Sequence, residues 1–102
     1  MISDEASLPG EDLVRQGLND LAQARVTDFS LLILIAAPRL RNLGVPVPPQ
    51  DSVEPFEHQL YSRLEARLGT GAHSHYNSLI RRVVSYARSV EREGQRAAAQ
   101  TS

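Results

Sequence analysis

The chain has 102 residues, 41% of them apolar, with a net charge of −1. This is enough for one domain with a modest core. Cys is absent, which excludes disulfides, thiolate nucleophiles and thiolate metal sites. The longest apolar run, Leu31–Ala37, is far shorter than the roughly 20 residues of a membrane span. No basic stretch precedes an apolar run at the N-terminus, so we expect a soluble cytoplasmic protein without membrane association.

Charge is distributed unevenly along the chain. Residues 1–35 hold six acidic residues and two arginines, whereas residues 36–102 hold six acidic residues and nine arginines. Lys is absent, so the cationic side chains other than His are all Arg, whose planar guanidinium group suits carboxylates and phosphates. This asymmetry favours an acidic partner or head-to-tail self-association. It is weaker than the basic excess of a dedicated nucleic-acid-binding protein.

The first predicted helix covers residues 9–25, and residues 1–8 before it are expected to be frayed. Ser7 is the predicted N-cap, and Pro9 is tolerated in the first turn. Gly17 lies within the apolar stripe and predicts a close approach of another helix. The residues of that stripe are Leu13, Val14, Leu18, Leu21 and Ala24.

The second predicted helix covers residues 28–43, with Thr27 as its cap and Asp28 as an acid in its first turn. Its segment Leu31–Ala37 is apolar on every side, which predicts a central, enclosed helix. Pro38 cannot donate a backbone hydrogen bond, so we expect the helix to kink or restart there.

Gly44 is the predicted terminator of this helix. The next segment, Val45–Gln50, contains three prolines and favours an extended, stiff connection. The third predicted helix covers residues 51–68, with a cap at its first or second residue and Pro55 in its first turn. Its apolar stripe consists of Val53, Phe56, Leu60, Leu64 and Leu68.

The fourth predicted helix covers residues 72–93, and residues 94–102 are expected to form a flexible tail. Apolar residues at helical spacing form one stripe along it: Tyr76, Leu79, Ile80, Val83, Ala87 and Val90. Polar residues lie on the opposite side: Arg81, Ser85, Arg88 and Arg92. The predicted fold is therefore all-α, a compact four-helix bundle in one domain over residues 9–93.

Two groups of residues that contain His are candidate metal sites. The pair His73 and His75 supplies only two ligands, which would point in nearly opposite directions on a helix. The second group follows helical spacing in the third helix and joins one His to carboxylates: Glu54, His58, Tyr61 and Glu65. It lacks the Glu and His spacing of di-iron bundles, so we interpret it as a solvated edge with a weak Glu54–His58 pair. We predict neither a metal ion nor a cofactor.

Arg67 and His73 are separated by five residues across a Gly-containing turn. This spacing resembles the R-x4–6-H signature of HEPN-type helical ribonucleases, although Leu68 follows the Arg where a polar residue is usual. The resemblance is limited to this one motif. It implies metal-independent RNA cleavage, with His73 as acid–base and Arg67 stabilising charge on the phosphorane.

No phosphate-binding loop, nucleophile elbow or catalytic triad spacing is present, so a non-enzymatic function is favoured. The leading hypothesis is a helical interaction module, such as a regulatory, adaptor or antitoxin-like subunit. Its partner is a protein with an acidic surface or a second copy of the chain; the alternative is RNA binding or HEPN-like cleavage. The predicted docking residues are Arg81, Arg82, Tyr86, Arg88 and Arg92, since Tyr and Arg are enriched in interface hot spots.

Overall fold

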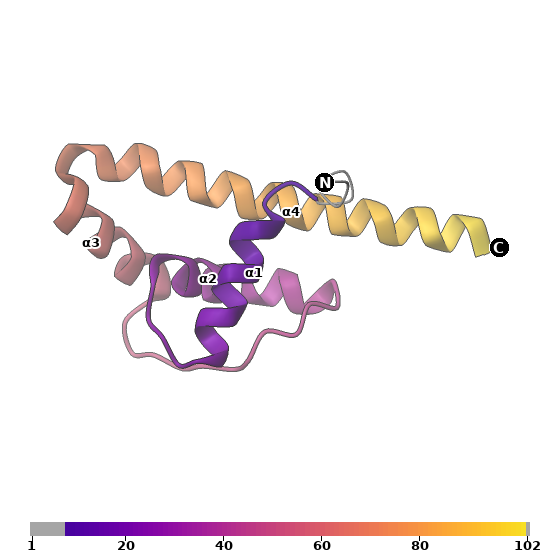
Figure 1. The fold of residues 1–102 in the computed structure, drawn as a ribbon, viewed down its shortest axis with the longest axis horizontal. Helices are drawn as coiled ribbons and strands as arrows, with labels where there is room; N and C mark the ends of the chain where they lie inside the picture. The colour runs from indigo at the N-terminus through magenta and orange to yellow at the C-terminus, as the bar shows by residue number, and fades with distance from the viewer. Residues whose placement is uncertain (1–7, 102) are drawn as a thin grey trace.

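A computed structural model describes the backbone of residues 8–101 and the side chains of residues 8–95. Regular structure in residues 8–101 is helical, without a β-strand, so the predicted all-α class is confirmed (Figure 1). The elements in chain order are α1 (Glu11–Ala22), α2 (Asp28–Asn42), α3 (Phe56–Leu68), the short 3-10 turn η2 (Gly69–Gly71) and α4 (Ala72–Thr101).

Helix α2 packs against α1, α3 and α4 and forms the centre of the core. Leu32, Ile33 and Leu40 are completely shielded from solvent. Burying each such side chain stabilises the fold by about 1.5–3 kcal/mol, and a helix that is apolar on every side gains this only when it is enclosed. The apolar sequence of α2 therefore explains its central position.

Helix α2 does not restart at Pro38 but continues to Asn42. Pro38 is exposed, so its ring occupies the solvent side and does not disturb core packing. The missing N–H removes one hydrogen bond of the helix. Helix α2 ends at Asn42, four residues after Pro38, so little helix remains to be redirected.

The chain leaves α1 and α2 in the same way, through Ala24 and Gly44, each two residues after the helix ends. Both residues adopt the left-handed conformation, with φ of 59° at Ala24 and 91° at Gly44. The N–H of the following residue donates to the carbonyl five residues earlier, at 2.8 Å after Ala24 and 2.9 Å after Gly44. These are Schellman ends, which confirms the prediction for Gly44. Ala24 adopts the conformation at a cost of roughly 1–2 kcal/mol.

Helix α1 is shorter than the predicted range 9–25. It begins after Gly10, whose φ of 75° is left-handed, so the chain turns there instead of continuing a helix from Pro9. It ends at Ala22 because the Schellman end reverses the chain. The predicted cap Ser7 lies outside the described residues.

Helix α3 begins at Phe56, not at residue 51, and this prediction was wrong. Pro55 precedes the helix with an extended backbone, and the residue before a proline is itself driven to extended conformations. The helix therefore cannot extend back through this segment, and Val53 is fully exposed instead of joining the apolar stripe. Leu60 and Leu64 of that stripe are buried as predicted.

Helix α4 continues to Thr101, beyond the predicted end at residue 93. Its 30 residues span about 45 Å and account for most of the 49 Å length of the molecule. In Figure 1 its yellow C-terminal part extends past the other helices. Residues 95–100 are all Gln, Arg or Ala, which are good helix formers. The helix therefore continues through residues 94–101 of the predicted tail.

Candidate binding pocket and arginine face

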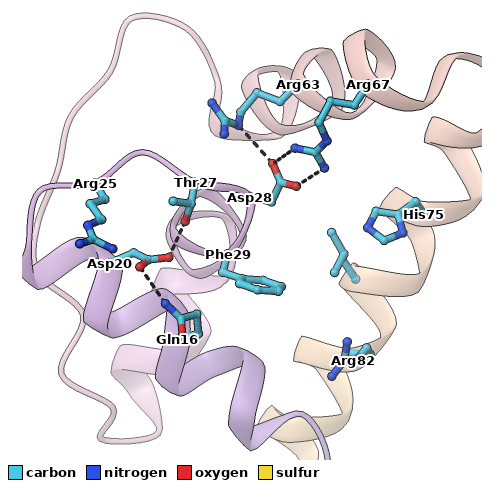
Figure 2. Close-up of a pocket in the computed structure, with 11 residues that line it drawn as sticks. Gln16, Asp20, Arg25, Thr27, Asp28, Phe29, Arg63, Arg67, His75 and Arg82 are labelled. Atoms are coloured by element: carbon cyan, nitrogen blue, oxygen red, sulfur yellow. Dashed lines mark hydrogen bonds and ion pairs between the residues drawn. The ribbon is translucent and has the colours of Figure 1, made fainter.

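A pocket of about 510 Å³ opens between the α1–α2 turn on one side and α3 and α4 on the other (Figure 2). This volume lies within the range of small-molecule sites. We name it the arginine pocket after the four guanidinium groups that line it, which belong to Arg25, Arg63, Arg67 and Arg82.

The start of α2 forms one wall of this pocket and is fixed by a reciprocal cap. The Thr27 backbone N–H donates to Ser30 Oγ at 2.8 Å, and the Ser30 N–H donates to Thr27 Oγ1 at 3.1 Å. The predicted cap at Thr27 is therefore confirmed. The cap holds Asp28 in the first turn, where the positive end of the helix dipole favours a carboxylate.

Asp28 joins α2 to α3 through two arginines. Its Oδ1 accepts from Arg63 Nε at 3.1 Å and Arg67 Nη1 at 3.3 Å, and its Oδ2 accepts from Arg67 Nη2 at 2.5 Å. Burial by itself would raise the pKa of Asp28, but the hydrogen bonds from Arg67 and Arg63 outweigh it and lower that pKa. We call Asp28, Arg63 and Arg67 the α2–α3 junction.

Asp20 connects α1 to the start of α2 and is only 3% exposed. Its Oδ2 accepts from the Thr27 hydroxyl at 2.6 Å, and its Oδ1 accepts from Gln16 Nε2 at 2.9 Å. Both carboxylate oxygens are thus satisfied, as buried charge requires. Among the side chains of residues 8–95, no buried polar atom lacks a hydrogen-bond partner.

The remaining two arginines of the pocket are weakly engaged. Arg82 Nη2 lies 3.5 Å from an oxygen of the exposed Asp12, and Arg25 forms no side-chain hydrogen bond or ion pair within residues 8–95. Between these charges lies an apolar floor, which consists of Leu79 and of Phe29, whose ring points from α2 toward α4 (Figure 2). The pocket thus combines a cationic rim with an apolar floor.

Three of the predicted docking residues form a separate surface, which we call the outer face of α4. Arg81, Arg88 and Arg92 are exposed on the side opposite the buried stripe of this helix. None of the three forms a hydrogen bond or ion pair with any other described side chain. Their guanidinium groups are therefore unpaired within the described residues, and Arg88 and Arg92 line a surface hollow together with Pro9.

The other two predicted docking residues, Arg82 and Tyr86, lie on the flank of α4 that faces α1. A Cβ built on Gly10 would lie 2.5 Å from the Arg82 carbonyl oxygen and 3.3 Å from Tyr86 Cβ. Burial raises the pKa of Tyr86, and the nearby Glu11 carboxylate raises that pKa further. Tyr86 therefore packs within the molecule, and the structure does not place the five predicted residues on one face.

Arg67 and His73, the pair behind the ribonuclease resemblance, do not line one pocket. The His73 ring nitrogen Nε2 lies 3.2 Å from the Asn77 amide nitrogen, and its centroid lies 6.4 Å from that of Tyr61. His75, two residues later, lines the arginine pocket instead. This follows from helix geometry, since residues two apart point in nearly opposite directions.

The predicted Glu54–His58 pair is present, with 2.9 Å between His58 Nδ1 and Glu54 Oε2. Both side chains are largely exposed, so the pair contributes little to stability. In the part of the chain that the structure describes, no group of three or more His, Cys, Asp or Glu residues could hold a metal ion.

Sequence reasoning missed the α2–α3 junction and Asp20. Arg63 and Arg67 are four residues apart, which places them on one face of α3 and was the available signal. Asp28 was interpreted only as a first-turn acid. Its partners lie 35 and 39 residues away, a contact that local spacing cannot predict.

No known protein family model, curated protein or solved structure matches the chain. The helices within the described residues lack the length and apolar composition that crossing a membrane requires. Function must therefore be inferred from the residues of this chain.

Proposed function

We propose that the protein is a small non-enzymatic helical interaction module that docks an acidic partner protein on the outer face of α4. The observation that carries this proposal is the row of three exposed, unpaired arginines on one side of one helix. From Arg81 to Arg92 the row spans about 16 Å, which matches several turns of an acidic helix. Arg pairs with carboxylates through two parallel hydrogen bonds.

In this proposal the helices over residues 9–93 form one bundle around α2, whose role is to support α4. Arg82 and Tyr86 lie at the edge of the docking surface, next to α1. They enlarge this surface, but the main docking residues are the three arginines of the outer face. This arrangement suits a regulatory, adaptor or antitoxin-like subunit. A second copy of the chain is the alternative protein partner, and RNA is the alternative polyanion.

Charge reversal on the outer face tests the proposal. In a quantitative pull-down, Arg81→Glu/Arg88→Glu should lower recovery of the partner at least about tenfold, because like charges facing each other cost several kcal/mol. The matched control is Arg15→Glu, which reverses an arginine of α1 that is 75% exposed and, among the described side chains, pairs only with Glu11 of its own helix. This control should recover the partner normally.

Circular dichroism should show unchanged helicity in both variants, since exposed substitutions shift stability by about 0.5 kcal/mol or less. Unchanged recovery by the double variant would contradict the docking surface. Loss of recovery after nuclease treatment would identify RNA as the bound polyanion and contradict a protein partner.

A further inference from the structure

The arginine pocket has an excess of positive charge that its own carboxylates do not neutralise. Four guanidinium groups and two carboxylates line it, which leaves a net charge of +2 with His75 neutral. Both carboxylates already accept hydrogen bonds on each oxygen: Asp20 from Gln16 and Thr27, and Asp28 from the two arginines of the junction. An added anion would therefore meet unsatisfied donors instead of exposed carboxylates.

Of the two weakly engaged arginines, Arg82 lies three residues after Leu79 on the same side of α4, whereas Arg25 lies on the α1–α2 turn. Arg82 is therefore the donor beside the apolar floor. Its nearest carboxylate oxygen belongs to Asp12, at 3.5 Å, and the Asp12 side chain is 83% exposed. An exposed ion pair of this kind contributes little, so a ligand can replace it at small cost. Arg67, by contrast, is held by Asp28 at the far end of the pocket.

The floor of the pocket selects for an apolar body. Phe29 is half-buried and lies between Arg82 and the α2–α3 junction (Figure 2). Leu79, which is 3% exposed, lines the same pocket. Binding sites for small organic molecules combine such apolar surface with a few placed polar groups. The cavity of about 510 Å³ admits one ring or a short aliphatic chain.

We propose that the arginine pocket binds a small organic carboxylate, with its head group on Arg82 and its apolar body on Phe29 and Leu79. Arg82 lies at the edge of the docking surface, but the three arginines of the outer face of α4 do not line the pocket. The proposal for this pocket therefore does not depend on the proposed docking function.

Titration of the full chain with 3-phenylpropionate, followed by amide chemical shifts in NMR, tests the site. We expect saturable shifts at Phe29, Leu79 and Arg82 with a Kd of about 1 mM. The neutral analogue 3-phenylpropionamide has the same apolar body without the charge. It should bind about tenfold more weakly, because a hydrogen bond to a charged group is worth that factor or more.

Arg82→Gln should weaken binding of the acid about tenfold and leave binding of the amide unchanged. Its matched control, Arg88→Gln, removes an arginine from the other side of the same helix and should bind the acid like the wild type. The proposal is overturned if the acid and the amide bind equally. It is also overturned if the chemical shift changes lie outside the pocket, or if they are not saturated at about 10 mM acid.

Discussion

The α2–α3 junction and the outer face of α4 both present arginines on helices, yet they differ in what those arginines meet. At the junction two guanidinium groups converge on one carboxylate that is only 16% exposed. On the outer face three guanidinium groups meet no described partner. The same residue type therefore serves the fold in one place and is available to a partner in the other.

The difference shows that burial of the carboxylate decides the role of an arginine. An exposed ion pair contributes about 0–1 kcal/mol, whereas removing the partner of a partly buried charge leaves that charge desolvated and unpaired. Changes at the junction should therefore lower stability. Changes on the outer face should leave stability unaltered and act on binding alone.

The largest loss of stability is expected at the contact between α1 and α2. A Cβ on Gly17 would lie 2.6 Å from the Phe29 carbonyl oxygen and closer still to Ile33 Cγ1, so Gly17→Ala forces the helices apart. We expect a net loss of about 2 kcal/mol in the free energy of unfolding, measured in urea. Such a shift would disturb the wall that carries Asp28.

The matched control is Gly94→Ala in α4, where an added Cβ meets nothing within 4 Å. It should stabilise the protein by up to about 1 kcal/mol, the ordinary gain of Ala over Gly in a helix. If Gly17→Ala were stabilising to the same extent, the close approach of α1 and α2 would be contradicted.

Asp28→Asn should have the second largest effect. The free energy of unfolding should fall by about 1 kcal/mol at neutral pH, because both junction arginines lose their carboxylate partner. The pKa of Asp28 is lowered from its ordinary value of 3.8. Its contribution to stability is therefore complete above that value and is lost as the pH falls through the lowered pKa. Urea unfolding of both proteins at neutral pH and below about pH 4 should show the difference shrinking in acid.

Asp12→Asn is the control for this substitution, since Asp12 is 83% exposed and its one ion pair within residues 8–95 is with Arg82. Its effect should stay within about 0.5 kcal/mol. Equal losses for the two variants, or a difference that grows toward acid pH, would contradict the role given to Asp28.

The sequence predicted what depends on local spacing. The all-α class, the cap at Thr27, the end at Gly44 and the buried stripe of α4 all follow from residues close together in the chain. Helix α3 does not start at residue 51 because Pro55 drives the residue before it to an extended conformation. Helix α4 does not end at residue 93 because the helix formers around Gly94 outweigh the cost of that glycine.

Local sequence patterns could not predict most of the arginine pocket, for a different reason. Its walls come from α1, α2, α3 and α4, and the contact between Asp28 and Arg67 spans 39 residues. The sequence pattern groups Arg67 with His73 in one spacing motif. In the folded protein Arg67 instead forms an ion pair with Asp28. Only the arrangement of the helices distinguishes the arginines that are paired from those that are not.

The most direct test of that distinction is the urea midpoint of Arg67→Gln compared with Arg88→Gln, each also made in the Asp28→Asn background. Arg67→Gln should lower the midpoint in the wild-type background and have little further effect once Asp28 is gone, since the two residues act as a pair. Arg88→Gln should leave the midpoint unchanged in both. Equal effects of the two substitutions, or a loss at Arg67 that does not depend on Asp28, would contradict the division between junction and outer face.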